Sequence, residues 1–433
     1  MIWNPEKECA SREELHRLQS ERLVNIVKYT YDNVKFYHER MDACGVKPSD
    51  IRSIDDIGML PFMTKQDLRD YYPTETFAAP MSEIVRFHAS SGTTGKPIVA
   101  GYTRNDLDNW SEGVARCLTA YGLSKHDIIQ ISYGYGLFTG GLGAHEGATK
   151  VGCSVLPASS GNTSKQLLLM KDLGVTALCC TPSYALFLAE SLHSTPGFSP
   201  DQMNLKVGIF GAEPWSENMR AELEDKLGIK AYDIYGLTEV SGPGVGGECE
   251  YQDGTHIWED MFYPEIIDPN TCRPLDYGQT GELVFTTLLK EGMPVIRYRT
   301  RDLTHLNADR CRCGRTMVRM GKIMGRTDDM LIVRGVNVFP SQIESVILEF
   351  AECSGQYLIT IDRINNNDTF QLDLELRPDC YSDNMSRMEN LKKEIVGRLA
   401  SVIGLKCDLH IVEPGNIERS CGKAKHVADL RKI

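Results

Sequence analysis

Residues 86–103 read RFHASSGTTGKPIVAGYT and contain a glycine-rich run. The P-loop of nucleoside triphosphatases needs four residues between its glycines, followed by Lys and then Ser or Thr at the start of a helix. Here only two residues separate Gly92 from Gly95, and Pro97 stands where the hydroxyl residue should be. The β-branched and aromatic residues at 98–103 favour a strand over a helix. We therefore predict a loop that joins two strands.

The composition of this loop suits an anion. Its glycines allow the backbone to approach a ligand closely, and its hydroxyls and single ammonium group supply hydrogen-bond donors. A polyphosphate is the natural guest, although an ordinary hairpin turn could have the same composition. The predicted phosphate-binding residues are Ser90, Ser91, Gly92, Thr93, Thr94, Gly95 and Lys96.

The overall composition predicts a globular, cytoplasmic protein of two or three domains. The formal net charge of -12 on 433 residues argues against a nucleic-acid partner, because phosphate backbones are held by clustered Lys and Arg. The sequence has no apolar stretch of membrane-spanning length and no signal-peptide layout, so we expect no membrane partner. Its 14 cysteines are then expected to be reduced thiols.

The pattern of apolar residues changes along the chain. Residues 11–43 have helical spacing and predict one or two amphipathic helices. Residues 126–212 alternate short apolar runs with helical segments, which indicates a mixed or parallel sheet covered by helices on both faces. Residues 231–305 predict an antiparallel β subdomain, with strands such as 256–268 separated by Gly, Pro and Asn turns.

A second domain is expected near the C-terminus. A polar turn at Asp328 precedes a strand and an amphipathic helix, and the remaining sequence is long enough for a core of its own. We therefore predict an α/β fold. A large N-terminal domain (1–327) would hold mixed sheets, helices and the β subdomain, and a small mobile C-terminal α+β domain would span 328–433.

The run SSGTTGKP resembles the phosphate loop of the adenylate-forming enzymes, which include acyl-CoA ligases, adenylation domains and luciferases. DIYGLTEV at 233–240 is similar to a segment of that superfamily in which an aromatic residue lines adenine, a Thr contacts phosphate and a Glu holds Mg²⁺. A carboxylate is a hard ligand suited to this cation. The resemblance implies nucleotide-site roles for Asp233, Tyr235, Gly236, Thr238 and Glu239, the last two also catalytic.

Two further segments match the same superfamily in the expected order. GIFGAEP (208–214) resembles the loop beside adenine, and YRTRDL (298–303) resembles the segment whose Asp grips the ribose hydroxyls. By itself this Asp could equally form a surface ion pair with Arg301. The resemblance implies contacts to ATP or AMP from Gly211, Ala212, Glu213, Pro214 and Asp302.

Matches near the predicted hinge and the C-terminus complete the pattern. In GRTDD (325–329), the resemblance places Arg326 near the nucleotide and Asp328 at the hinge, where an ordinary loop residue is the alternative. In IERSCGKAKHV (417–427), Lys423 matches the lysine that reaches the α-phosphate and the acid in the first half-reaction. A solvated tail lysine is the alternative, and Lys425 competes for the same role.

Within the superfamily, the chain resembles phenylacetate-CoA ligases over nearly its full length, including 60–73, 86–103 and 133–152. The resemblance implies an aryl carboxylic acid substrate and coenzyme A as the acceptor. Aromatic rings and close backbone approach at glycine suit a flat aryl slot, although core packing would use the same residues. The candidates are Tyr133, Tyr135, Gly136, Phe138, Gly140 and Gly141.

A separate group of residues has the chemistry of a metal site. Cys249, His256, Cys311 and Cys313 offer three thiolates and an imidazole, a set that suits tetrahedral structural Zn²⁺. Only one residue separates the last two cysteines, which is closer than the common two-residue gap, so free thiols are the alternative. We expect zinc to stabilise the β subdomain and to have no catalytic role.

Together these matches predict a two-step ligase that uses ATP, Mg²⁺ and coenzyme A, forms an acyl-adenylate and releases AMP and pyrophosphate. One alternative is an adenylating enzyme that loads an aryl acid onto a carrier-protein phosphopantetheine. A second is a zinc-stabilised interaction protein without catalysis. The N-terminal helices could support a homodimer.

Overall fold

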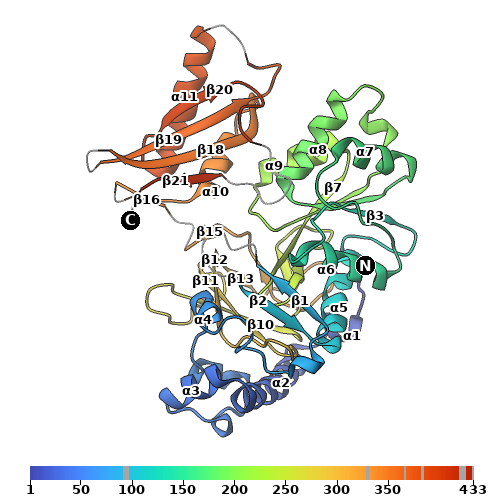
Figure 1. Cartoon of the computed structure of the whole chain (residues 1–433), viewed down its shortest axis with the longest axis vertical. Coiled ribbons are helices and arrows are strands. Elements are labelled where there is room, and N and C mark those ends of the chain that lie inside the picture. Colours follow the sequence, from blue (N-terminus) through green and yellow to red (C-terminus); the bar gives the residue numbers. More distant parts are fainter. Residues whose placement is uncertain are drawn as a thin grey trace. The chain divides into compact units, whose positions relative to one another are not determined.

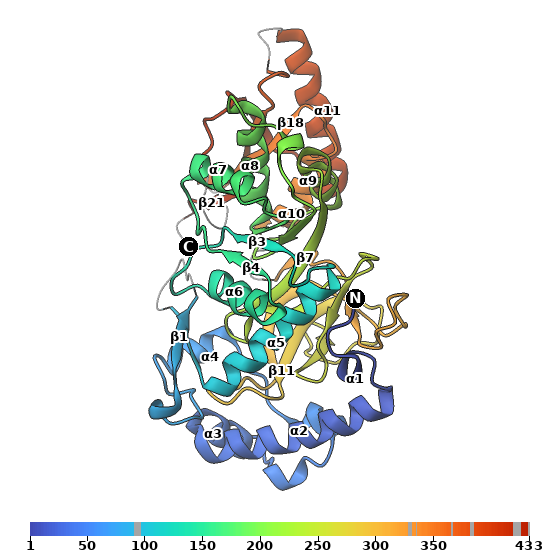
Figure 2. The ribbon, with the colours of Figure 1, turned by 90° about the vertical axis from the view of Figure 1, so that its right-hand side faces the viewer.

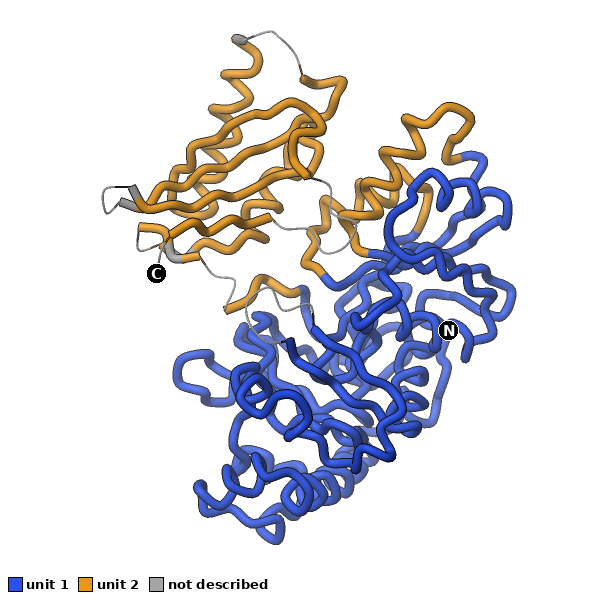
Figure 3. The backbone as a smooth tube through the Cα atoms, in the orientation of Figure 1, with its two compact units in different colours: residues 1–180, 201–212, 230–322 blue, residues 181–200, 213–229, 323–433 orange. Residues whose placement is uncertain are grey.

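The computed structural model describes residues 1–90, 97–327, 331–334, 336–364, 367–381, 385–418 and 426–431. The chain forms two compact units (Figure 3). One contains residues 1–180, 201–212 and 230–322, and the other contains residues 181–200, 213–229 and 323–433. The expected boundary at Asp328 falls on an undescribed residue and stays a prediction. Within the described ranges, no helix combines the length and apolar character needed to cross a bilayer.

Helices open the first unit, with α2 and α3 forming one end of it (Figure 1). Helix α2 begins after Ser11, whose hydroxyl accepts the N–H of Glu14 at 3.2 Å. It buries an apolar side that includes Leu15 and Leu23, and the extended residue Val34 separates it from α3. The prediction of helices over 11–43 is confirmed. The helices are α1 (Pro5–Glu8), α2 (Arg12–Asn33), α3 (Lys35–Ala43) and α4 (Lys65–Asp70), with 3₁₀ turns at Pro48–Asp50, Ile54–Met59 and Met81–Glu83.

Strands flank the glycine-rich loop on both sides, as predicted. Strands β1 (Arg86–Ala89) and β2 (Val99–Tyr102) pair antiparallel. Helix α5 (Arg104–Ala120) follows at once, started by a capping box in which Thr103 and Asp106 exchange hydrogen bonds. The helix that a P-loop requires is therefore replaced by a strand at 99–102.

A nine-stranded sheet forms the centre of this unit, in the order β13-β14-β9-β8-β7-β6-β5-β3-β4. Its strands β4, β3, β5, β6 and β7 are parallel, as the β-α alternation predicted, and β5 is buried along its whole length. The parallel strands are β3 (Ile128–Ile131), β4 (Ser154–Leu156), β5 (Ala177–Cys180), β6 (Val207–Phe210) and β7 (Lys230–Leu237). The helices that follow these strands in sequence are α6 (Thr139–Val151), α7 (Thr163–Asp172), α8 (Pro182–Ser194) and α9 (Glu217–Leu227), with a 3₁₀ turn at Pro200–Gln202. Of these, α8 and α9 belong to the second unit.

Beyond β7 the same sheet continues with antiparallel strands. The predicted antiparallel region was therefore wrong at its beginning, because β7 pairs in parallel with β6 and antiparallel only with β8. The turn between β7 and β8 is thus the point at which the sheet changes direction. The remaining strands are β8 (Gly242–Gly247), β9 (Thr255–Ile257), β13 (Leu306–Asn307) and β14 (Arg319–Met320).

Helices α5 and α6 pack against each other (Figure 2). Both also pack against β8. Glycines allow this close approach. A Cβ atom on Gly143 would collide with the ring of Trp110, and one on Gly147 would collide with the side chain of Val114. The two helices therefore fit together only without side chains at these positions.

A second sheet contains the antiparallel strands β10 (Phe262–Ile267), β11 (Gly281–Thr287) and β12 (Tyr298–Thr304). The prediction of one strand over 256–268 was wrong, because a turn separates β9 from β10 here. In that turn Glu259 pairs with Arg12, and Asp260 pairs with Arg116. The pair of Asp260 and Arg116 is buried, whereas Arg12 is half-exposed. Both ion pairs depend on partners far away in sequence.

The second unit contains a small α+β fold with its own apolar core, as predicted. Its sheet has the order β20-β19-β18-β21, and the core includes Ile343, Ile359, Leu372 and Leu399. A short hairpin precedes it. The elements are β15 (Gly325–Arg326), β16 (Leu331–Val333), β17 (Val336–Val338), α10 (Pro340–Ile347), β18 (Cys353–Ile364), β19 (Asn367–Leu376), α11 (Met385–Ile403), β20 (Asp408–Val412) and β21 (Val427–Asp429).

Candidate active site

Several predicted site residues follow the carboxyl ends of parallel strands. Tyr133 comes after β3, Gly211 after β6 and Thr238 after β7. Ligands of parallel α/β sheets bind at this edge. The structure joins two of these positions directly, since the Tyr133 hydroxyl donates to the Gly211 carbonyl at 3.1 Å. Gly211 must lack a side chain, because a Cβ atom would collide with the carbonyl of Ile234.

The residues predicted for the two sides of the nucleoside also meet. The Tyr235 hydroxyl on β7 donates to Oδ2 of Asp302 on β12, at 2.6 Å. Asp302 is only 7% exposed, so it is not the solvated carboxylate of a surface ion pair. Its neighbour Arg301 reaches Glu282 at 3.5 Å. The contact between Tyr235 and Asp302 links the nine-stranded sheet to the second sheet at the site predicted for adenosine.

The turn after β7 presents the two predicted catalytic residues of this segment. Thr238 and Glu239 are each 6% exposed, and the Thr238 hydroxyl lies 3.4 Å from that of Thr139. The ammonium group of Lys65 lies 3.8 Å from Oε1 of Glu239. A carboxylate next to a cation at a strand end can bind a hard metal ion or exchange one positive partner for another.

Sequence reasoning missed Lys65. Lys65 lies within the segment 60–73 that resembles phenylacetate-CoA ligases, but this resemblance predicted no role for it. The only local signal was the capping box of Thr64 and Asp67, which starts α4 at this residue. Lys65 lies near Glu239 only because the chain before it pairs with a segment far away in sequence. The N–H of Met63 donates to the Arg297 carbonyl at 3.1 Å, and the Met63 carbonyl accepts from the N–H of Arg299 at 2.9 Å.

The phosphate loop is described only at its first residue. Ser90 exchanges hydrogen bonds with Ile98 through its main chain at 2.9 Å and its hydroxyl at 3.1 Å, which closes the end of the hairpin. The other predicted phosphate residues, 91–96, lie outside the described residues. The structure therefore fixes where the loop leaves β1 and re-enters before β2.

Comparisons with known proteins agree with this geometry. The AMP-binding enzyme family matches residues 9–288, and the AMP-binding enzyme C-terminal domain matches residues 335–431. The chain is 51% identical to Phenylacetate-coenzyme A ligase of Escherichia coli (strain K12), with 98% of this chain and 97% of the relative covered. It is 46% identical, over the whole of both chains, to the Phenylacetate-coenzyme A ligase of Thermus thermophilus.

The chain belongs to the phenylacetate-CoA ligase family of AMP-binding enzymes. The solved structure of 2-Hydroxyisobutyryl-CoA Ligase in complex with 2-HIB-AMP is also similar, with a TM-score of 0.93 and 28% identity over 99% of this chain and 92% of that chain. These findings confirm the predicted family and the prediction of an ATP-dependent, AMP-forming ligase that works through an acyl-adenylate.

The aryl-slot candidates of this phenylacetate-CoA ligase family member lie between β3 and α6. Tyr133 is buried, whereas Tyr135 and Phe138 are half-buried. The Tyr135 hydroxyl lies 3.2 Å from Nδ1 of His145, and burial raises the pKa of Tyr135. A Cβ atom on Gly141 would meet the carbonyl of Gly134 at 2.8 Å. Gly136 is exposed and Gly140 is buried.

Other residues matched to the family have different surroundings. Glu213, predicted to lie beside adenine, accepts the N–H of Ser183 at the start of α8 through Oε1, at 2.8 Å. It follows Ala212, whose φ of 73° marks a sharp turn after β6. Arg326 lies on β15 in the second unit. Asp328 and Lys423 lie outside the described residues.

Main-chain contacts fix the segment that leads to the adenosine site. The N–H of Asp233 donates to Glu248 at 2.7 Å, and its carbonyl accepts from the Tyr121 hydroxyl at 2.7 Å. Gly236 lies so close to the Gly242 carbonyl that a Cβ atom would collide with it. Strand β7 therefore reaches the site with a fixed backbone.

The four predicted zinc ligands come together in the first unit. The ligand atoms of Cys249, His256, Cys311 and Cys313 all lie within 4.8 Å of one another. Two sulfurs bound to tetrahedral Zn²⁺ at about 2.3 Å would be about 3.8 Å apart, and the Sγ atoms of Cys249 and Cys311 are 3.7 Å apart. Hydrogen bonds from Cys249 and His256 lower the pKa of Cys313, which favours a thiolate. The donor set and its spacing fit zinc.

Proposed function

We propose that this chain activates phenylacetate, or a closely related arylacetate, with ATP and transfers the acyl group to coenzyme A. In the first step the substrate carboxylate attacks the α-phosphorus, the bond from that phosphorus to the bridging oxygen breaks, and pyrophosphate leaves. In the second step the coenzyme A sulfur attacks the acyl carbon, its proton passes to solvent, and AMP leaves. Splitting the condensation in this way requires no nucleophile on the protein.

One observation carries the proposal. The Tyr235 and Asp302 contact lies at the carboxyl end of β7, which continues into Thr238 and Glu239. It occurs in a chain that is 51% identical to Phenylacetate-coenzyme A ligase over 98% of its length. The order of predicted residues along the strand, adenosine first and phosphates next, is the order of groups along ATP.

The residues of the first unit would act mainly by positioning. The Tyr235 ring would lie along adenine, Asp302 would accept hydrogen bonds from the ribose hydroxyls, and Thr238 would donate to phosphate. Mg²⁺ would neutralise charge on the triphosphate, and Glu239 is the residue proposed to hold it. Carboxylate oxygens at a buried strand end support this assignment.

Further donors would act on the phosphates from the predicted loop and the C-terminal domain. The hydroxyls, N–H groups and ammonium of residues 90–96 would hold the β- and γ-phosphates. Lys423 would neutralise charge that develops between the α-phosphate and the acid. Rotation at Asp328 would then exchange this lysine for the surface that receives coenzyme A. Arg326, which precedes the hinge in sequence, would also approach the nucleotide.

The acid would bind against the segment that joins β3 to α6. Tyr135 and Phe138 are half-buried and offer aromatic surface, while Gly136, Gly140 and Gly141 permit close approach. The link between Tyr133 and Gly211 supports a common wall between the acid and the nucleotide. With the aryl ring held here, the carboxylate at the end of a one-carbon spacer would reach the α-phosphate from this side.

We also propose that the four-residue cluster of Cys249, His256, Cys311 and Cys313 holds a structural Zn²⁺ ion that has no part in the reaction. Three thiolates and an imidazole form a closed tetrahedral set without an open position for substrate. The ion would tie β9 to the turn before β14, two segments that are far apart in sequence.

The cellular location and assembly are further proposals. The described cysteines form no disulfides, which supports the reducing environment of the cytoplasm. A homodimer would use α2 and α3, whose solvent-facing sides lie on the surface of the first unit. Light scattering of the purified full chain would test the assembly.

A panel of carboxylic acids tests the function. AMP release is measured with ATP, Mg²⁺ and coenzyme A for phenylacetate, ring-substituted arylacetates, indole acids, benzoate and 2-hydroxyisobutyrate. We expect the highest kcat/KM with phenylacetate or a close arylacetate. Preference for a carrier protein over free coenzyme A, or absence of AMP release with every acid, would contradict the proposal.

A further inference from the structure

A buried lysine lies behind the turn that presents Glu239. Lys290 is only 6% exposed, and its ammonium group donates to the carbonyls of Glu239 at 3.3 Å and Val240 at 2.9 Å. The ammonium also lies 4.7 Å from the centre of the Tyr102 ring. The lysine therefore holds the main chain of the residue whose carboxylate is proposed to bind Mg²⁺.

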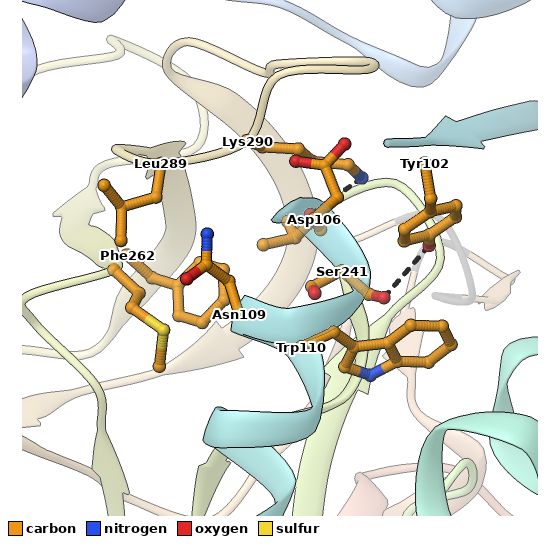
Figure 4. A pocket seen from close by; sticks show the side chains of 10 residues that line it. Tyr102, Asp106, Asn109, Trp110, Ser241, Phe262, Leu289 and Lys290 are labelled. Atoms are coloured by element: carbon orange, nitrogen blue, oxygen red, sulfur yellow. Dashed lines mark hydrogen bonds between the residues drawn. The ribbon is translucent and has the colours of Figure 1, made fainter. Parts of the chain in front are cut away.

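Tyr102 holds the same turn from another direction. Its hydroxyl lies 2.9 Å from the carbonyl of Ser241 and 3.3 Å from that of Thr238. Figure 4 shows the Lys290 ammonium group beside the Tyr102 ring, and both side chains line a small cavity together with Ser241. Between them, the two side chains contact all four carbonyls of residues 238–241. We call this arrangement the carbonyl clamp.

The cavity beside the clamp is too small for a substrate. Its volume of about 20 Å³ is enough for a single water molecule. Its lining includes Asp106, Trp110 and Phe262 in addition to the clamp residues. The lysine therefore serves the turn it bonds to, because no acid or nucleotide could enter to meet it.

The clamp lysine is itself held in place. Oδ1 of Asp106 accepts the N–H of Glu291 at 2.7 Å, and its Oδ2 accepts the N–H of Gly292 at 2.8 Å. A Cβ atom on Gly292 would collide with the Gly101 carbonyl and with Asp106. Asp106, which belongs to the capping box of α5, thus fixes the backbone from which Lys290 extends.

Burying an ammonium group costs free energy, so a buried lysine needs interactions that an apolar side chain could not make. Burial lowers the pKa of Lys290 to about 8, while the negative charges of Asp106 and Glu239 oppose this shift. A methionine or leucine would fill the same space without that cost. What an apolar side chain could not do is donate to the Glu239 and Val240 carbonyls.

We propose that Lys290 and Tyr102 are positioning residues of the adenylation step, which set the Mg²⁺ and phosphate contacts of Glu239 and Thr238 by holding their main-chain carbonyls. The proposal rests on the function proposed for Glu239. The clamp acts through the turn and touches no substrate. Without it, the carbonyls of a buried turn lose their donors and the carboxylate loses its fixed direction.

The test uses the full chain and ATP–pyrophosphate exchange with phenylacetate, measured as a function of Mg²⁺ concentration. The variants are Lys290→Met and Tyr102→Phe. The control is Gln19→Met, which removes a buried amide that donates to the Glu259 carbonyl at 3.0 Å, away from the clamp. Thermal melting establishes that each variant is folded.

We expect the Mg²⁺ concentration for half-maximal exchange to rise about tenfold in Lys290→Met and about threefold in Tyr102→Phe. It should stay unchanged in Gln19→Met. A purely structural role would reduce the active fraction, and hence kcat, while leaving this concentration unchanged. If a folded Lys290→Met protein needs the same Mg²⁺ concentration for half-maximal exchange as the natural sequence, the proposal is overturned. If Lys290→Met does not fold, the same comparison is made with Tyr102→Phe.

The outcomes also separate this proposal from the function on which it rests. A natural-sequence protein that shows no Mg²⁺-dependent exchange with any acid would overturn the proposed function. An active natural-sequence protein whose folded clamp variants keep its Mg²⁺ dependence would overturn the clamp alone.

Discussion

The hydroxyl of Tyr235 lies 2.6 Å from Oδ2 of Asp302, and this contact joins strands of two different sheets. The two residues stand 67 positions apart in sequence. A short hydrogen bond to a buried carboxylate fixes both the phenol ring and the carboxylate. The first prediction tests whether this pair orients the nucleoside.

Replacing Asp302 with Ala should reduce kcat/KM for ATP on the order of 100-fold, because the ribose hydroxyls lose a charged acceptor. With 2′,3′-dideoxy-ATP, which lacks those hydroxyls, the loss should nearly disappear. Tyr235→Phe keeps the ring and should raise KM for ATP only about threefold. If Asp302→Ala lowers kcat/KM by the same factor for ATP and for 2′,3′-dideoxy-ATP, Asp302 does not bind the ribose hydroxyls.

Lys423→Ala should lower the adenylation rate by at least about 100-fold, because the developing charge loses its cation. Thioester formation from supplied phenylacetyl-adenylate and coenzyme A should remain. Lys425→Ala is the matched control and should retain both half-reactions. Loss of both half-reactions in Lys423→Ala, or a larger adenylation defect in Lys425→Ala, would show that the assignment is wrong.

The purified protein should contain one zinc ion per chain, measured by elemental analysis. Cys311→Ser should lose the ion and lower the melting temperature, since binding energy at a closed site contributes to folding. Cys44→Ser changes an exposed cysteine outside the cluster and should keep the metal. A full zinc content in the Cys311→Ser protein, or no zinc in the natural sequence, would exclude the site.

Lys290 should make stability depend on pH in a defined direction. Its pKa is about 8 in the folded chain and 10.5 for an ordinary lysine. Between these values the unfolded chain binds the additional proton, so the contribution of Lys290 to the free energy of unfolding increases with pH. The charges of Asp106 and Glu239 oppose the effect of burial on the pKa of Lys290, and Lys290 in turn lowers the pKa of His88.

Melting temperatures of the natural sequence and of Lys290→Met, measured from pH 7 to pH 10, test this dependence. The melting temperature of the natural sequence relative to that of Lys290→Met should rise with pH. Other groups that titrate in this range are the same in both proteins, so their effects cancel in the difference. Gln19→Met should follow the natural sequence in parallel. Parallel curves for Lys290→Met as well would mean that Lys290 has an ordinary pKa.

Local sequence patterns predicted much of the fold. The strand residues on either side of SSGTTGKP predicted the hairpin, and the β-α alternation over 126–212 predicted the parallel strands. These features depend on neighbours in sequence. The division of 256–268 into two strands did not, because it arises with the ion pairs of Glu259 with Arg12 and of Asp260 with Arg116.

The candidate site divides in the same way. Tyr235 and Asp302 could be predicted because each lies in a segment that resembles a family motif. Lys65 and Lys290 could not, because a single lysine has no periodic or spacing signal. Both reach Glu239 only after distant segments pair, through Met63 with β12 and through Asp106 with the turn at 291–292.

Glycine packing between α5 and α6 limits how this enzyme can be redesigned. Gly143 and Gly147 leave no room for a methyl group against Trp110 and Val114, so the start of α6 cannot be shifted without separating the two helices. Changes of acid specificity are therefore best sought by resizing Tyr135 or Phe138 ahead of the helix. A library that varied the helix register would lose folded protein before it gained new substrates.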